Sequence, residues 1–285
     1  MTPREQRARL ARETLAIVSS GRYADDAGND VVIADALRAC LAATRLFMPQ
    51  HIAALRLPAA DSSRPAAAFA VRDENTLSAL ARLVAAGCSR VGVLNFASAR
   101  HPGGGFERGA QAQEEALARS SALHASLVSE AAAPFYRTAP DEASCLYTDR
   151  VILSPDCPVF RDADGRLLRS PVPATFLTCA APNASALQSN ESERLPLLPE
   201  TFARRAAGVL AVAAHADCDA LVLGAWGCGV FGNDPALVAS VFARHLCAGG
   251  AFENRFAHVD FAVLDSAPDR ARLRAFERAF PQGAS

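Results

Sequence analysis

The sequence predicts an α/β fold in which helices cover both faces of a mostly parallel or mixed β-sheet. Three observations predict it. Short apolar runs alternate with longer amphipathic segments, which is the pattern of strands connected by helices. Two of these runs end in glycine-rich loops, at 103–105 and 227–232, as strands do at the ligand-binding edge of α/β sheets. With 285 residues, 51% of them hydrophobic, the chain can also bury a large core.

The N-terminal part is expected to be helical. Residues 4–20 carry a thin apolar face that Gly21 ends, and residues Asp35 to Phe47 form a second helix that Pro49 ends. We predict that residues 1–65 form an accessory helical segment packed on a core domain, residues 66–285.

The core is expected to alternate strands with helices. Asp73 suits the N-cap of its first helix and Gly87 the end, and Asp164-Gly165 suits a turn between two strands. The polar stretch 183–193 has little periodicity and is interpreted as a lid or a crossover loop. The strands are expected at 66–71, 91–96, 147–154, 174–179, 220–224 and 259–264, and the later helices at 110–129, 199–214, 234–247 and 268–280.

Composition excludes several classes of protein. Twenty-nine basic and 30 acidic residues give a net charge of −1, so no overall field attracts nucleic acid, and no sequence-specific nucleic-acid binding is expected. No apolar window of membrane-spanning length and no secretory leader is recognisable, so we expect a cytoplasmic protein, acting as a monomer. The eight cysteines are scattered without zinc-ligand spacing, so reduced thiols and no metal are expected.

The most informative stretch joins a triple glycine to a pair of carboxylates. A strand ending near Asn95 leads into Gly103-Gly104-Gly105, and Gln113-Glu114-Glu115 then opens a helix. Three adjacent glycines bury no side chain and lose the most backbone entropy on folding. They are expected where the backbone approaches a ligand closely, so this stretch is predicted to be a binding site.

A second glycine-rich loop, Gly227-Cys228-Gly229-Val230-Phe231-Gly232, follows the apolar run 220–224. Backbone amides of such loops bind phosphates, and Asn233 or Asp234 is expected to cap the next helix. The letters also match the Gly-x-Gly-x-x-Gly pattern of dinucleotide-binding folds. That interpretation is disfavoured, because no acidic residue ends a second strand about 20 residues later.

The two blocks together resemble the poly(ADP-ribose) glycohydrolase family. Its signature is Gly-Gly-Gly, a short variable run and Gln-Glu-Glu, matched here by 103–105, 106–112 and 113–115; residues 94–127 resemble the microbial branch. Residues 224–233 resemble its diphosphate-binding loop. The resemblance implies a macrodomain-like α/β/α sandwich with a mixed central sheet and an accessory N-terminal helical layer, residues 66–285 being the catalytic core.

The resemblance also implies roles for the carboxylates. Glu115 is the catalytic residue, which protonates the leaving oxygen and then activates water, while Glu114 orients the substrate through ribose hydroxyls. Gln113 positions the pair. Adjacent residues of a helix point about 100° apart, so the two acids cannot share one role. The structural alternative is that both acids suit a first helical turn, with Glu115 pairing to Arg119.

Several implied contacts have a second interpretation. Asn95 either meets the ligand or ties down the strand end, and Phe231 either packs against the ribose or joins the core. Ser98 departs from the asparagine that many macrodomains carry there, although its hydroxyl can donate and accept. Cys228 has no neighbouring histidine and is interpreted as a small residue beside phosphate. The expected ligand-binding residues are Asn95, Ser98, Gly103, Gly104, Gly105, Gln113, Gly227, Cys228, Gly229, Val230 and Phe231.

The implied activity is hydrolysis of the ribose–ribose O-glycosidic bonds of poly(ADP-ribose), which releases ADP-ribose without a cofactor. The expected partners are ADP-ribose and the polymer attached to protein, in reversal of ADP-ribosylation and the DNA damage response. Two alternatives share these residues: a mono-ADP-ribosyl hydrolase acting on protein or DNA, and a non-catalytic ADP-ribose-binding macrodomain.

Overall fold

The computed structural model of the protein describes residues 1–56, 65–137 and 143–281. The helices are α1 (Pro3–Ser20), α2 (Ala34–Ala43), α3 (Pro49–Ala53), α4 (Thr76–Ala85), α5 (Gln113–Ser120), α6 (Leu123–Leu127), α7 (Ala184–Asn190), α8 (Leu198–His215), α9 (Pro235–Leu246) and α10 (Ala271–Ala279), with 3-10 helices η1 (Phe106–Arg108), η2 (Ala133–Tyr136) and η4 (Ser192–Leu197). The strands are β1 (Arg22–Ala24), β2 (Asp30–Val32), β3 (Arg45–Phe47), β4 (Ala68–Arg72), β5 (Val91–Phe96), β6 (Val151–Arg161), β7 (Leu167–Cys179), β8 (Ala220–Leu223) and β9 (His258–Ala262).

Seven strands form one mixed sheet in the order β3-β6-β7-β5-β8-β9-β4. Strands β7, β5, β8, β9 and β4 run parallel to one another, whereas β6 is antiparallel to both β7 and β3. The carboxyl ends of five parallel strands therefore meet at one edge of the sheet, which is where α/β sheets bind ligands.

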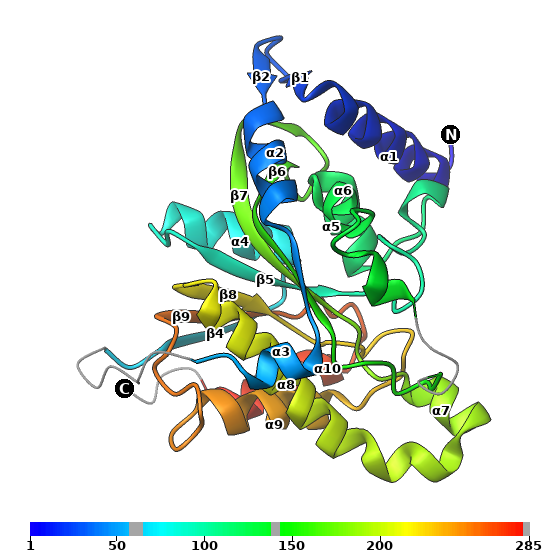
Figure 1. Ribbon diagram of the computed structural model, residues 1–285, viewed down its shortest axis with the longest axis vertical. Helices are drawn as coiled ribbons and strands as arrows, with labels where there is room; N and C mark the ends of the chain where they lie inside the picture. The colour runs from blue at the N-terminus through cyan, green and yellow to red at the C-terminus, as the bar shows by residue number, and fades with distance from the viewer. Residues whose placement is uncertain (57–64, 138–142, 282–285) are drawn as a thin grey trace.

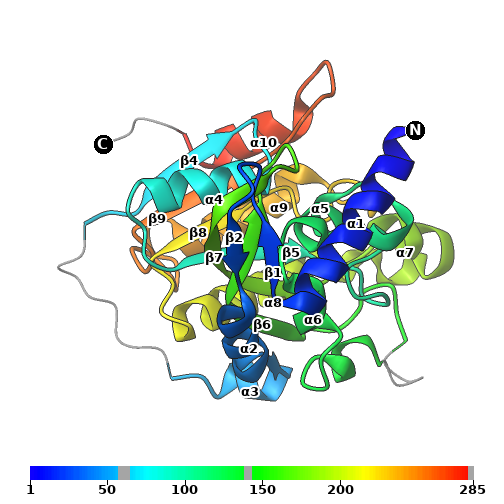
Figure 2. The same cartoon turned by 90° about the horizontal axis from the view of Figure 1, so that it is seen from above.

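Helices cover both faces of this sheet (Figures 1 and 2). On one face α8, α9 and α10 bury Phe202, Phe242 and Phe276 against alternate strand residues such as Phe261. On the other, α2, α4, α5 and α6 pack on a second apolar layer that includes Val93 of β5. The alternation of side chains along each strand supplies both layers, and the sandwich expected from the sequence is confirmed.

The N-terminal segment adds a helix and a small hairpin to this sandwich. Helix α1 begins at a capping box of Thr2 and Glu5 and ends at Gly21, whose φ is 69°. It lies beside α5 and η1 (Figure 2). Strand β3 joins the main sheet through β6. The division at residue 65 stays a prediction, and residues 57–64 before it lie outside the described residues.

The helix expected at 110–129 is wrong as a single element. The chain leaves α5 at Ser121, which forms a bridge to Val159 of β6, and the amide of Ala122 donates to the carbonyl of Pro158 at 3.0 Å. The hydroxyl of Ser121 also bonds the carbonyl of Leu117 at 2.7 Å. These contacts draw the backbone toward the sheet, so a second helix, α6, starts after the break.

Three shorter expectations are also corrected. The helix expected over Asp35 to Phe47 ends at Ala43, because its last residues pair with β6 as β3. Helix α4 takes its cap from Asn75, whose side chain accepts from the amide of Ser78 at 3.0 Å, while Asp73 binds Arg270 instead. The polar stretch 183–193 forms α7 and the start of η4 rather than a loop.

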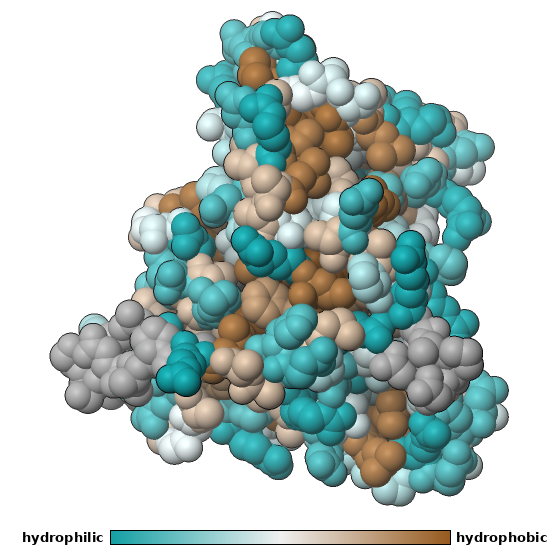
Figure 3. All heavy atoms as spheres, in the orientation of Figure 1, coloured by the Kyte–Doolittle hydropathy of each residue, from teal (hydrophilic) through white to brown (hydrophobic). Residues whose placement is uncertain are grey.

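The surface has no continuous apolar belt on the face in Figure 3, where hydrophilic residues cover most of the helices and apolar residues emerge in separate patches. Within the three described ranges, no helix is both long enough and apolar enough to cross a membrane.

Candidate active site

A cleft of about 520 Å³ lies at the carboxyl ends of the parallel strands. Its size suits a small ligand, and its walls are mostly apolar with a few polar groups, as ligand sites are. Most of the lining residues come from the N-terminus of α4, the start of α5, the second glycine loop and the segment after β9. They are Glu74, Asn75, Thr76, Leu77, Phe96, Gln111, Ala112, Gln113, Ala116, Leu117, Ala163, Ala181, Ala225, Trp226, Gly227, Gly229, Val230, Phe231, Ala262, Val263, Leu264 and Arg272.

Gln113 connects three elements at the floor of this cleft. Its side-chain oxygen accepts from the amide of Phe96 at 2.9 Å. Its amide nitrogen donates to the carbonyl of Leu94 at 2.8 Å and to the hydroxyl of Thr76 at 3.2 Å. The first residue of α5 is thereby tied to β5 and α4, which fixes the start of the helix that carries both carboxylates.

Glu115 lies against the triple glycine. Its Oε1 accepts from the amide of Gly105 at 3.0 Å. A Cβ on Gly104, whose φ is 60°, would collide with the same oxygen, so glycine is required there both for space and for backbone conformation. Glu115 Oε2 is buried and accepts no hydrogen bond from the described residues. A buried, unpartnered carboxylate oxygen is costly in a folded protein and points to a ligand.

Glu114 has a different environment from its neighbour. Its side chain is 3% exposed, and its oxygens accept from the amide of Ser98 at 2.7 Å and from the Asn95 side chain at 3.4 Å. Burial raises the pKa of Glu114 to about 8, although the hydrogen bonds from Ser98 and Asn95 act to lower it. Glu114 is therefore mostly protonated at neutral pH and can donate a hydrogen bond.

Asn95 and Ser98 support Glu114 from the end of β5. The Asn95 side chain is fully buried, and its amide also donates to the hydroxyl of Thr178 at 3.2 Å, while its own oxygen has no partner among the described residues. The Ser98 hydroxyl accepts from the backbone amides of Arg100 and His101. Neither residue lines the cleft; both hold the carboxylate and the loop in place.

The second glycine loop closes the opposite wall. Asn233 donates to the carbonyls of Gly227 at 3.0 Å and Pro182 at 2.8 Å, and Asp234 caps α9 through the amide of Ala236. A Cβ on Gly227, with φ 74°, would stand 2.6 Å from that of Ala181. Of this loop, Gly227, Gly229, Val230 and Phe231 line the cleft and Cys228 does not. Burial raises the pKa of Cys228 to about 12, which disfavours a thiolate nucleophile.

Phe231 is supported from behind. Its ring lies 5.9 Å from that of Tyr147, and its carbonyl accepts from the amide of Ser185 at the start of α7. The carbonyl of Tyr147 accepts from Arg205, a fully buried arginine of α8 that also pairs with Asp149 at 2.9 Å. A single cation of the core thus anchors the segment on which Phe231 rests.

Two charged residues of the cleft are not among the site residues predicted from the sequence. Glu74 follows β4 and Arg272 lies in α10, where it pairs with the buried Asp265 at 2.9 Å. The place of Glu74 after a strand was a usable signal, because carboxyl ends of parallel strands share an edge. No sequence pattern indicated Arg272, because only the order of the strands in the sheet brings α10 beside the second glycine loop.

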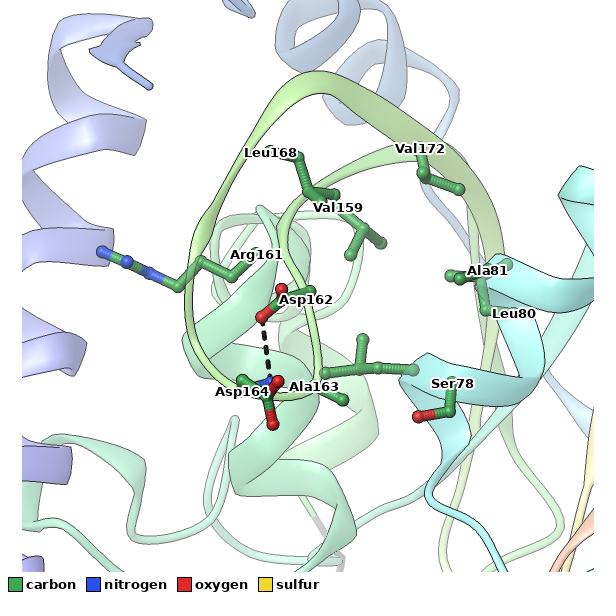
Figure 4. Close-up of a pocket in the computed structure, with 11 residues that line it drawn as sticks. Ser78, Leu80, Ala81, Val159, Arg161, Asp162, Ala163, Asp164, Leu168 and Val172 are labelled. Atoms are coloured by element: carbon green, nitrogen blue, oxygen red, sulfur yellow. Dashed lines mark hydrogen bonds between the residues drawn. The ribbon is translucent and has the colours of Figure 1, made fainter. Parts of the chain in front are cut away.

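A smaller cavity of about 170 Å³ lies between α4 and the β6–β7 hairpin (Figure 4). It shares Leu77 and Ala163 with the cleft. Arg161 points away from it and binds Glu13 of α1 at 3.1 Å, and Asp162 is occupied by the amide of Asp164 at the hairpin turn. Its lining includes Asp162 and Asp164 of the hairpin turn but neither Glu114 nor Glu115, which follow Gln113, a residue of the larger cleft.

The chain is similar to proteins of known structure. Residues 11–162 match the family model for the microbial-type PARG catalytic domain. Poly(ADP-ribose) glycohydrolase from Thermomonospora curvata is 48% identical, with a TM-score of 0.91 over 97% of this chain and 100% of that one. Its structure with the inhibitor ADP-HPD is 47% identical, with a TM-score of 0.89 and the same coverage.

The enzyme from Deinococcus radiodurans, solved in complex with ADP-ribose, is 47% identical, with a TM-score of 0.80 over 86% of this chain and 97% of that one. Among curated proteins, none matches. Within the described residues, no group of three or more metal-ligating side chains is placed to hold a metal ion. The structural matches confirm the expected macrodomain-like sandwich. The family model and these identities together show that the chain belongs to the microbial-type poly(ADP-ribose) glycohydrolase family.

Proposed function

We propose that this chain is a poly(ADP-ribose) glycohydrolase, which hydrolyses ribose–ribose O-glycosidic bonds and releases ADP-ribose. The observation that carries the proposal is the state of Glu115. One of its oxygens is held by the glycine loop, and the other is buried without a partner among the described residues. Membership of the microbial-type family supports this activity.

ADP-ribose is assigned to the cleft. Its volume, about 520 Å³, falls in the range of small-molecule sites. The backbone of Gly227, Gly229 and Val230 offers amides to the diphosphate without side-chain bulk, and Phe231 packs against the distal ribose. The Deinococcus radiodurans relative in complex with ADP-ribose supports this ligand.

Glu115 performs the proton transfers. In its protonated form it donates a proton to the oxygen that leaves the C1″ atom of the distal ribose, as the glycosidic bond breaks and an oxocarbenium ion develops. The resulting carboxylate then removes a proton from water, which adds to C1″. Neutral Glu114 donates a hydrogen bond to a ribose hydroxyl and orients the sugar. Asn95 and Ser98 fix Glu114, so they act as positioning residues.

The proposal includes the setting of the reaction. The polymer is attached to protein, and the chain works as a monomer in the cytoplasm. All eight cysteines are free, which fits a reducing compartment.

The decisive experiment compares the wild-type protein with Glu115→Gln on purified poly(ADP-ribose). Released ADP-ribose and the affinity for ADP-ribose are measured separately. We expect Glu115→Gln to lose at least about a hundredfold in rate, as general acid–base residues do, while its affinity stays within about threefold. Glu130→Gln removes an exposed carboxylate outside the site and serves as the control. Binding without release by the wild-type protein overturns the proposal in favour of an ADP-ribose reader or a mono-ADP-ribosyl hydrolase.

A further inference from the structure

Three arginines lie together beside the turn that follows the triple glycine. Arg108 belongs to this turn, while Arg4 and Arg7 come from the first turns of α1. None of the three forms an ion pair among the described residues, whereas Arg9, Arg82 and Arg161 do. Like charges left together without carboxylate partners repel each other, so this cluster has a use for an anion.

Helix α1 holds the turn that carries Arg108. The Nε of Arg4 donates to the carbonyl of Arg108 at 3.0 Å, and the Nε of Arg7 donates to the carbonyl of Gly109 at 2.9 Å. A Cβ on Gly109, whose φ is 72°, would collide with the carbonyl of Arg4. The backbone of η1 is therefore locked to α1, while the Arg108 side chain remains exposed.

The guanidinium of Arg108 lies close to the Glu115 carboxylate. The point where a Cβ of Gly105 would stand is 4.0 Å from Arg108 Nη2 and also 4.0 Å from Glu115 Oε1. The two groups are thus separated by no more than twice that distance, with Gly105 between them. Glu107 lies on the same turn but does not pair with Arg108.

The substrate places an anion at this end. In poly(ADP-ribose), the oxygen that leaves C1″ belongs to the adenosine ribose of the next unit, and that ribose carries its own diphosphate a few bonds away. The proposed function puts the bound unit's diphosphate on the second glycine loop, which lines the cleft, whereas Glu115 lies outside the cleft lining. Because Gly105, which binds Glu115, immediately precedes η1, a diphosphate on the leaving side of Glu115 is within reach of the exposed Arg108 side chain.

We propose that Arg108, supported by Arg4, binds the diphosphate of the polymer unit on the leaving side of the scissile bond. A guanidinium suits this role, because its planar fork donates two hydrogen bonds to phosphate oxygens. The site gives the chain a preference for polymer over ADP-ribose that carries an uncharged leaving group. This inference rests on the proposed function, since it takes the polymer as the substrate.

The test compares two substrates. One is poly(ADP-ribose), and the other is an ADP-ribose whose C1″ carries an uncharged nitrophenyl ether, which lacks the second diphosphate. For Arg108→Gln we expect kcat/KM on the polymer to fall about threefold to tenfold at low salt, as for one exposed charge-assisted contact, and to stay within twofold on the nitrophenyl substrate. Arg108→Lys restores most of the loss, because it keeps the charge. Arg38→Gln, an exposed arginine of α2, is the matched control.

A binding measurement separates this proposal from the proposed function. In the Glu115→Gln background, Arg108→Gln is expected to weaken polymer binding by the same factor and to leave ADP-ribose affinity unchanged. The slope of log affinity against log salt becomes shallower by about 0.7, the value for one phosphate contact on a single strand. Equal losses on both substrates, or an unchanged polymer affinity, overturn the assignment. Failure of the wild-type protein to release ADP-ribose overturns the proposed function, and the binding arm still decides the role of Arg108.

Discussion

The aromatic rings of Tyr147 and Phe231 lie 5.9 Å apart, although Tyr147 makes this contact from a left-handed backbone conformation with φ of 59°. Such a φ is strained for a bulky residue and persists only where the surroundings impose it. Arg205 binds the carbonyl of Tyr147 at 3.3 Å, and Asn183 donates to its hydroxyl at 3.4 Å. These contacts therefore hold Tyr147 in its strained conformation, in which its ring supports Phe231 in the wall of the cleft.

Tyr147→Gly separates the ring from the backbone conformation. Glycine adopts a positive φ freely, so the substitution relieves the strain and removes the ring together with the hydroxyl that accepts from Asn183. An aromatic pair contributes about 0.5–1.5 kcal/mol, so we expect ADP-ribose affinity to fall about twofold to tenfold by calorimetry. Tyr147→Phe keeps the ring and is expected to bind within twofold of wild type. Wild-type affinity in the glycine variant contradicts a role for the ring.

Glu114 makes stability depend on pH. Burial raises its pKa in the folded protein to about 8, from an ordinary value of 4.5. Between these values the folded chain holds a proton that the unfolded chain has lost. The contribution to stability is therefore complete below the unfolded pKa and is lost as the pH rises through the folded pKa.

Glu114→Gln removes this dependence, because glutamine stays neutral. Urea unfolding at pH 5, 6, 7 and 8 measures it. The wild-type free energy of unfolding is expected to fall as the pH rises from 5 to 8. Its slope should be steeper than that of Glu114→Gln by about 1.4 kcal/mol per pH unit, because one proton is involved. Glu130→Gln, at an exposed position of the chain, should reproduce the wild-type slope. Parallel curves for Glu114→Gln and wild type would show that Glu114 is ionised in the folded protein.

Gly104→Ala tests the close approach of the glycine loop to Glu115. Its Cβ would collide with Glu115 Oε1, and its φ is 60°. We expect polymer hydrolysis to fall by more than about tenfold, because a misplaced catalytic group loses rate steeply. Gly28→Ala, in the hairpin between β1 and β2, also has a positive φ, 83°, but its Cβ would meet nothing within 4 Å. It controls for backbone strain alone, so equal activity losses in both variants would exclude a specific contact with Glu115.

The sequence predicts the residues that carry the site's chemistry better than the residues that hold them in place. The triple glycine, the carboxylates and the second glycine loop form contiguous motifs, so local pattern and family resemblance place them beside strand ends. The break at Ser121 depends on pairing with Val159 of β6, a contact between segments far apart in sequence. No local pattern reports such a contact, and an uninterrupted helix was the natural expectation.

Buried residues that anchor loops through long-range contacts also leave no local sequence pattern. Arg205 lies in an alanine-rich helix and has the sequence appearance of an ordinary solvated residue. Its structural role depends on hydrogen bonds to Tyr147, Asp149 and Ala180. These residues flank the paired strands β6 and β7, so the pairing of these strands brings them to Arg205. Short motifs indicate residues that bind a ligand, whereas residues that support the site from a distance are identified only from the order and pairing of the strands.

Arg205 and its neighbour Arg204 offer a matched pair for testing such a support. Both bind Asp149, but the Arg205 side chain is 1% exposed and that of Arg204 is 55% exposed. Arg205→Met leaves the carbonyls of Tyr147 and Ala180 without their donor and removes one of two cations from Asp149. We expect a loss of about 3–5 kcal/mol in the free energy of unfolding, as for removal of one partner of a buried pair. Arg204→Gln is expected to cost less than about 1 kcal/mol, because its partner remains held and its charge is exposed to solvent.

Chemical unfolding of the two variants measures both values. Equal costs would mean that the shared contact with Asp149, rather than the buried bonds to the backbone, stabilises the wall behind Phe231.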